Sequence, residues 1–164
     1  MEATFAVLRK LREDGVLGDF AIGGAMAAMF YAEPVLTYDL DVFVALQRQG
    51  ALLTLSPLYE ALRQQGYEPS GECVDIEGVP VQFLPAASPL IEEAMRDAVE
   101  LPYGAVTTRV MRPEHLIAIC LQTGRPKDRD RVRLLAMEAE LNNSELTALL
   151  ERHGLCDRWK QWTA

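Results

Sequence analysis

The first clear pattern along the chain is a helical repeat of apolar residues, followed by short apolar runs. Phe5, Leu8 and Leu11 lie three residues apart, which predicts an amphipathic helix over residues 3–13. A run of apolar residues at 20–22 predicts a buried strand. Two glycines interrupt this strand, and the small apolar residues of AMAAMFYA predict a tightly packed helix after them.

The segment TYDLDVFVAL alternates in polarity, so it predicts a strand with two different faces. Leu40, Val42 and Val44 lie on one face of this strand. Asp39 and Asp41 lie on the other, and both carboxylates therefore point the same way.

The rest of the chain predicts strands over residues 67–84 and helices that begin near Ser56 and Pro89. Three further helical segments fill the last third: PEHLIAICLQTG, PKDRDRVRLLAMEAEL and NSELTALLERHG. Strands that alternate with helices and then give way to helices alone predict an α/β (α+β) fold. We expect a single domain, 1–164, with a small mixed sheet flanked by helices and a helical C-terminal part over about 112–164.

Composition and charge narrow the class of protein. The chain has 164 residues, of which 49% are hydrophobic and 24% charged, as in a globular domain. Its formal charge of −8 disfavours general binding to duplex DNA. Cys73, Cys120 and Cys156 form no metal-binding pair and are expected to be reduced thiols. Without an apolar run typical of a signal peptide or a membrane span, the sequence predicts a cytoplasmic protein with no membrane partner.

The segment GGAMAAMFYAEPVLTYDLDVFV carries the candidate chemistry. Glycines at a strand-to-helix turn let backbone N–H groups approach an anion, so Gly23 and Gly24 can cradle a phosphate. The carboxylates of Asp39 and Asp41 can converge on Mg²⁺, which prefers oxygen ligands. Taken singly, each motif is more often structural, because paired glycines allow close packing and a DxD pair commonly lies on solvated surface. Their combination favours a nucleotide or phosphate site.

This segment resembles the signature of the nucleotidyltransferase fold superfamily, which includes DNA polymerase β and the minimal nucleotidyltransferases. The paired glycines and the T-x-D-h-D strand formed by Thr37, Asp39 and Asp41 look most like the branch of the AbiEii-type toxin nucleotidyltransferases. The later block RPEHLIAICLQTGRPKDRDRV is also similar to that branch.

The resemblance implies Mg²⁺-dependent transfer of a nucleoside monophosphate from a nucleoside triphosphate to an acceptor, whether protein, RNA or small molecule. The catalytic and metal-binding residues that it implies are Asp39 and Asp41. The nucleotide-binding residues that it implies are Gly23, Gly24, Thr37 and Lys127.

Two positions depart from the pattern of the superfamily. Gln82, in VPVQFLP, occupies the expected place of a third carboxylate, and a neutral amide cannot act as a base. Val35 or Leu36 stands where many members of the branch carry an arginine. These departures favour an alternative function, in which a catalytically weak or inactive module senses nucleotide or binds protein, as one component of a toxin–antitoxin pair.

Asp75 offers a replacement for the third carboxylate. If Glu77 and Gly78 form a two-residue hairpin loop, Asp75 pairs with Pro80 and shares a sheet face with Gln82. The simpler alternative is a solvated acidic residue on a hairpin.

The cation-rich stretch 125–133 and His115 can each be explained as ordinary surface structure. Five cations occur between Arg125 and Arg133, with Asp128 and Asp130 interleaved. Two interpretations are open: the residues form ion pairs along a solvated helix, or the cations bind an anion. His115 is expected to be an exposed residue in the first turn of a helix.

Overall fold

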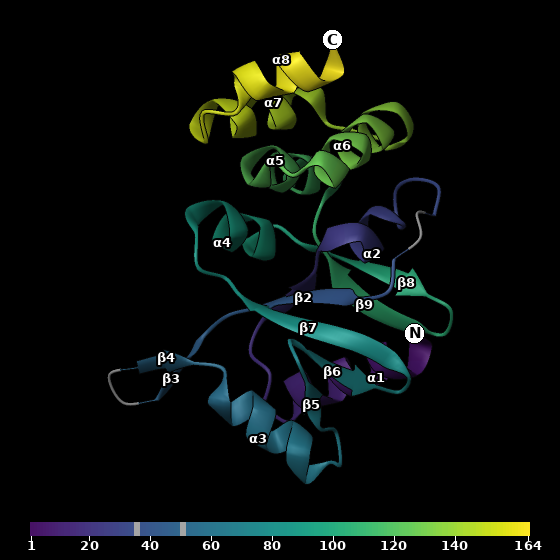
Figure 1. Cartoon of the computed structure of the whole chain (residues 1–164), viewed down its shortest axis with the longest axis vertical. Coiled ribbons are helices and arrows are strands. Elements are labelled where there is room, and N and C mark those ends of the chain that lie inside the picture. The colour runs from purple at the N-terminus through teal and green to yellow at the C-terminus, as the bar shows by residue number, and fades with distance from the viewer. Residues whose placement is uncertain (35–36, 50–51) are drawn as a thin grey trace.

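The computed structural model describes residues 1–34, 37–49 and 52–164 and shows a mixed sheet at the centre of the molecule (Figure 1). Seven strands follow the order β5-β6-β7-β2-β1-β9-β8. Their bounds are Phe20–Ile22 (β1), Leu40–Val44 (β2), Pro69–Ser70 (β5), Cys73–Ile76 (β6), Val79–Pro85 (β7), Val99–Tyr103 (β8) and Val106–Val110 (β9). The strand β2 runs antiparallel to β1 and parallel to β7, so the fold is α/β with a mixed sheet, as predicted.

Helices cover both faces of the sheet. Their bounds are Glu2–Glu13 (α1), Gly24–Ala28 (α2), Ser56–Gln64 (α3), Pro89–Arg96 (α4), Pro113–Thr123 (α5), Pro126–Glu138 (α6), Asn143–Arg152 (α7) and Cys156–Thr163 (α8). The hydroxyl of Thr4 in α1 donates to the carbonyl of Ile76, and Tyr59 in α3 makes an edge contact with Phe83. The helices α2 and α4–α8 lie on the opposite side of the sheet (Figure 1).

The alternation predicted for β2 is confirmed. Leu40, Val42 and Val44 are buried, whereas Asp41 and Phe43 are partly exposed on the other face. The strand begins one residue later than its pattern suggests, so Asp39 immediately precedes it. This alternation places the hydrophobic core beneath β2 and leaves the Asp41 face for polar chemistry.

Several elements differ from their predicted form. The helix α2 has only five residues, whereas α3 begins at Ser56 as predicted. The sequence patterns do not predict β8, α8 or the small hairpin of β3 (Gln47–Gln49) and β4 (Leu52–Thr54). Strands this short, and a polar helix such as α8, carry too few periodic apolar residues to stand out.

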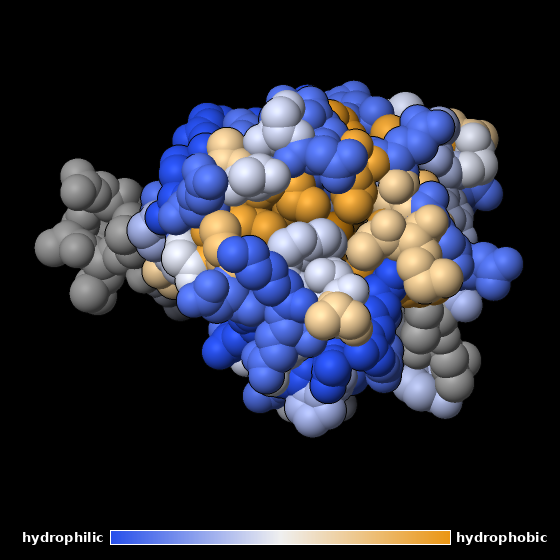
Figure 2. Space-filling view, turned by 90° about the horizontal axis from the view of Figure 1, so that it is seen from above, coloured by the Kyte–Doolittle hydropathy of each residue, from blue (hydrophilic) through white to orange (hydrophobic). Residues whose placement is uncertain are grey.

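The C-terminal helices pack over the sheet as a separate layer (Figure 1). Viewed from the end that carries α7 and α8, the surface is mostly hydrophilic around a central apolar strip (Figure 2). The expectation that His115 is exposed is wrong, because α4 and α7 cover the start of α5 and leave His115 only 6% exposed. Within the described part of the chain, no helix has both the length and the apolar character needed to cross a bilayer.

Candidate active site

The glycine pair lies directly against the acidic strand. Gly24 adopts a φ of +62°, and a Cβ built on it would lie 2.0 Å from Oδ2 of Asp41. A Cβ on Gly23 would lie 2.4 Å from the ring of Phe43, and its backbone N–H donates to the carbonyl of Asp41 at 3.0 Å. Only glycines therefore permit the strand-to-helix turn to approach Asp41 this closely.

Asp39 and Asp41 form an acidic pair at the start of β2. The hydroxyl of Thr37 donates to Oδ1 of Asp39 at 3.2 Å, which orients that carboxylate. Burial raises the pKa of Asp41, and the charge of Asp39 raises it further, while Arg131, Arg125 and Lys127 act in the opposite direction. A cation bound between the carboxylates would relieve their repulsion.

A cavity of about 600 Å³ opens in front of this pair. Its walls come from α2, from β2 and the segment before it, from β7, and from α6 with the residue that precedes it. The residues that line it are Ala25, Thr37, Tyr38, Asp39, Asp41, Gln82, Arg125, Lys127, Asp130, Arg131 and Leu134. A second cavity of about 450 Å³ shares Asp41, Gln82, Arg125 and Arg131 with the first, so the two meet at the centre of the site.

Two arginines, one in α6 and one directly before it, are held in place by one buried carboxylate. Asp128 is fully buried and accepts two hydrogen bonds from the guanidinium of Arg125, at 2.8 and 3.2 Å. Arg131 lies 3.6 Å from the same carboxylate, and its side chain is only 14% exposed. The interpretation of this stretch as ion pairing along a solvated helix is thus incomplete, because Asp128 fixes two arginines that line the cavity. The spacing of Arg125, Asp128 and Arg131 by three residues is the sequence signal for this arrangement.

Lys127 adds a third positive charge to the same wall. It is the second residue of α6. An acidic pair and a cationic wall thus face each other across one cavity.

Gln82 occupies the position expected for a third carboxylate. It pairs directly with Asp41 in the parallel register of β2 and β7. Its amide nitrogen donates to Oε2 of Glu72 at 3.3 Å. Burial raises the pKa of the neighbouring Cys73 thiol, and the charges of Asp39, Glu72 and Asp41 raise it further. Glu72, which the sequence patterns do not single out, is exposed and lines neither cavity, so it touches the site only through its hydrogen bond with Gln82.

Asp75 lies in the hairpin that its sequence predicts. It pairs with Pro80, and Glu77 and Gly78 form the loop with φ values of +55° and +79°. Its Oδ1 accepts a hydrogen bond from the backbone of Gly78 at 2.9 Å, and it does not line the cavity. The structure thus does not bring Asp75 to Asp39 and Asp41. Positions 35 and 36, where the resemblance expects an arginine, lie outside the described residues.

The donor atoms of the site fit Mg²⁺. Two adjacent carboxylates offer hard oxygen ligands, and Gln82 can add an amide oxygen because its nitrogen is engaged by Glu72. The absence of a side chain on Gly24 leaves Oδ2 of Asp41 accessible.

Comparison with solved structures identifies the fold. An antigenic nucleotidyltransferase-like protein from Paracoccidioides brasiliensis aligns over 92% of this chain and 85% of its own, with a TM-score of 0.60 and 15% identity. ANT(2")-Ia in complex with adenylyl-2"-tobramycin aligns over 93% of this chain and 94% of its own, with a TM-score of 0.58 and 16% identity. The solution structure of this antibiotic-resistance factor gives a TM-score of 0.59 at 14% identity over 98% of this chain and 94% of that one. The chain therefore has a nucleotidyltransferase fold.

Comparison of the sequence with protein-family profiles and with curated proteins gives no match. The finer resemblance to the AbiEii-type branch stays a prediction.

Proposed function

We propose that this protein is a nucleotidyltransferase that transfers a nucleoside monophosphate from a nucleoside triphosphate to an acceptor. The observation that carries the proposal is the juxtaposition of Asp39 and Asp41 with Arg125, Lys127 and Arg131 around one cavity. Carboxylates suit a divalent cation, and arginine and lysine suit the phosphates that such a cation accompanies.

Each part of the site has a distinct role in this proposal. Asp39 and Asp41 hold Mg²⁺, which when bound polarises the α-phosphate and neutralises the charge that develops on pyrophosphate. The three cations bind the triphosphate, and Asp128 positions two of them. Gly23, Gly24 and Thr37 shape the side of the site next to the carboxylates.

In the transfer step, an acceptor oxygen forms a bond to the α-phosphorus while the bond between that phosphorus and the leaving pyrophosphate oxygen breaks. The acceptor also loses a proton, which the neutral amide of Gln82 cannot accept. We assign this proton to solvent water, because Glu72, the carboxylate that is hydrogen-bonded to Gln82, lines neither cavity.

The experiment that tests the proposal offers each nucleoside triphosphate, labelled at the α-phosphorus, to the protein with Mg²⁺ and separate protein, RNA and small-molecule fractions of a cell extract. We expect label to pass to one fraction, and the transfer to fail in Asp41→Asn. As a control, Glu60→Gln removes an exposed carboxylate on the other side of the sheet and should leave transfer unchanged. Label transferred equally by Asp41→Asn would contradict the proposed site.

Gln82 favours a second candidate function, because it places a neutral amide directly beside Asp41, where the pattern of the superfamily expects a carboxylate. In that function the protein binds nucleotide without turnover and acts as a sensor or as a protein-binding component of a toxin–antitoxin pair. Mg²⁺-dependent nucleotide binding without label transfer to any fraction, together with co-purification of one partner, would favour this alternative.

A further inference from the structure

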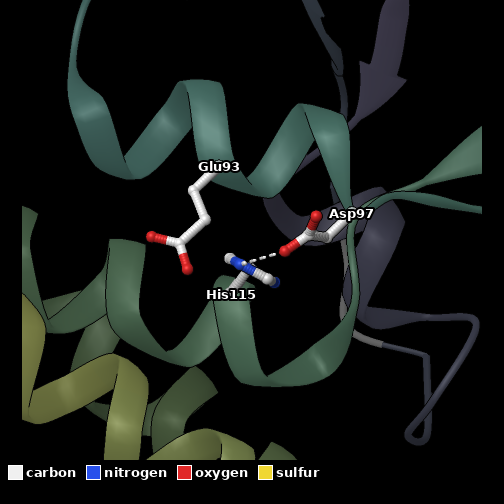
Figure 3. A group of neighbouring side chains, drawn as sticks. All are labelled: Glu93, Asp97 and His115. Carbon is white, nitrogen blue, oxygen red and sulfur yellow. Dashed lines mark ion pairs between the residues drawn. The ribbon is translucent and has the colours of Figure 1, made fainter.

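A second group of potential metal ligands lies at the junction of α4, α5 and α7. Glu93 in α4 and Asp97 at the end of that helix project toward His115 in the first turn of α5 (Figure 3). One ligand atom from each of the three residues lies within 4.8 Å of the other two. These residues border a cavity of about 370 Å³ that shares no lining residue with the two cavities at Asp41.

His115 is the feature that distinguishes this group from an ordinary acidic cluster. The residue is 6% exposed, yet neither ring nitrogen has a hydrogen-bond partner. Its Nε2 lies 3.8 Å from Oδ2 of Asp97, beyond hydrogen-bond distance (Figure 3). Buried imidazoles normally satisfy at least one nitrogen, so this unsatisfied ring needs an explanation.

The two carboxylates are oriented by surrounding side chains. Asp97 pairs through Oδ1 with Arg96 at 3.0 Å, which leaves Oδ2 on the side of His115. Glu93 pairs with Arg152 and accepts a hydrogen bond from His153 at 2.8 Å. Such outer hydrogen bonds fix the carboxylates that ligate metals and are typical of metal sites.

We propose that Glu93, Asp97 and His115 bind a Zn²⁺ ion that joins α4 to the C-terminal helices. One imidazole and two carboxylates are a ligand set of the kind Zn²⁺ accepts, with the fourth position left to a water from the cavity. Tetrahedral Zn²⁺ would hold its ligand atoms roughly 3.4 Å apart, so binding requires the three side chains to close by on the order of 1 Å.

The chemistry of the ligands separates this site from the one at Asp41. An imidazole nitrogen favours Zn²⁺ and similar transition ions, whereas the oxygen-only set of Asp39, Asp41 and Gln82 suits Mg²⁺. Two cations border the cavity: Arg112, which pairs with Glu145, and Arg152, which pairs with Glu93. Asp97 and Glu93 present the carboxylate oxygens that a divalent cation needs, and the cation would share Glu93 with Arg152.

Titration of the whole protein with Zn²⁺ in the presence of excess Mg²⁺ tests the proposal. We expect one Zn²⁺ per chain and a rise in Tm of about 5–10 °C at a hundredfold excess over the Kd. His115→Gln and Asp97→Asn should each weaken Zn²⁺ binding at least about tenfold. Asp97 is partly exposed, so its variant keeps the test decisive even if the His115 variant does not fold.

Two controls separate this site from others on the protein. Glu92→Gln removes an exposed carboxylate from the same helix and should leave Zn²⁺ binding unchanged. Asp41→Asn should also leave it unchanged, which makes the outcome independent of the proposed transferase activity. Failure of the parent protein to bind Zn²⁺, or equal binding by His115→Gln and Asp97→Asn, would overturn the proposal.

Discussion

Gly24 and Asp41, 17 positions apart in the sequence, are in such close contact that a single added carbon on the glycine would lie 2.0 Å from the carboxylate. The glycine also adopts a φ of +62°, which side chains other than hydrogen rarely allow. The paired glycines are therefore required by the acidic strand itself, whatever they contribute to binding phosphate.

This contact predicts a large penalty for Gly24→Ala. We expect the variant to lose roughly 2–4 kcal/mol of stability, from left-handed strain and from displacement of the Asp41 side chain. Gly15→Ala is a matched control, because Gly15 has a φ of +73° but open space around its Cβ position. Gly15→Ala should lose only about 1 kcal/mol of stability, from the left-handed strain alone. Thermal unfolding of the two variants measures the difference, and equal losses would show that the contact with Asp41 is unimportant.

The raised pKa of Asp41 predicts an unusual dependence of stability on pH. A carboxyl whose pKa is higher in the folded than in the unfolded chain destabilises the fold once it ionises. Its contribution to stability is therefore most favourable below the ordinary carboxyl pKa of 3.8 and is lost as pH rises through the higher pKa of the folded chain.

Asp41→Asn removes this effect, so without divalent cations the variant should have a higher Tm than the parent at pH 7. The gap should narrow as pH falls, and Mg²⁺ should stabilise only the parent. Melting curves between pH 8 and pH 4, with Glu60→Gln as the control for loss of a charge, provide the measurement. An Asp41→Asn variant less stable than the parent at pH 7 would contradict the conclusion that the charge of Asp41 destabilises the fold.

Gln82 predicts a gain of function. Gln82→Asp places a third carboxylate directly beside Asp41 in the sheet. We expect tighter Mg²⁺ binding, on the order of tenfold, because a charged ligand replaces a neutral one. Calorimetric titration with Mg²⁺ measures the change, and Gln82→Asn, which keeps a neutral amide, serves as the control. Equal affinities in the two variants would show that position 82 does not contact the metal.

Asp128 predicts a combined loss of stability and of nucleotide binding. Asp128→Asn removes the buried charge that holds Arg125 and Arg131, with an expected loss of about 2 kcal/mol. It should also weaken binding of a nucleoside triphosphate, since both arginines lose their orientation. Asp130→Asn, an acidic residue on the wall of the same cavity, should not weaken binding. A destabilised Asp128 variant with unchanged nucleotide affinity would assign Asp128 a purely structural role.

The sequence predicts those parts of the fold that depend on local periodicity. The apolar repeat of α1, the strand at Phe20–Ile22 and the alternation of β2 follow from spacing alone. The pairing of Asp75 with Pro80 follows from the geometry of a two-residue loop. In each case the determining contacts lie within a few residues.

Features that depend on packing between distant elements could not be predicted in this way. The charge pattern of α6 is compatible with a solvated helix, and only its packing against α5 and α2 directs Arg131 into the cavity. His115 follows a proline and a glutamate, which suggests an exposed turn, but α4 and α7 cover it. Glu72 contacts Gln82 because it precedes β6, the antiparallel neighbour of β7, a relationship that no local pattern encodes.

The most direct test of a nucleotide site at Asp39 and Asp41 is a thermal-shift titration with ATP, GTP, CTP and UTP, each with and without Mg²⁺. We expect at least one triphosphate to raise the Tm by several degrees only when Mg²⁺ is present, since a ligand at about 100 times its Kd stabilises the fold by roughly 2.7 kcal/mol. The shift should disappear in both Asp39→Asn and Asp41→Asn. An equal shift in the two variants, or no shift with any triphosphate, would contradict a nucleotide site at this acidic pair.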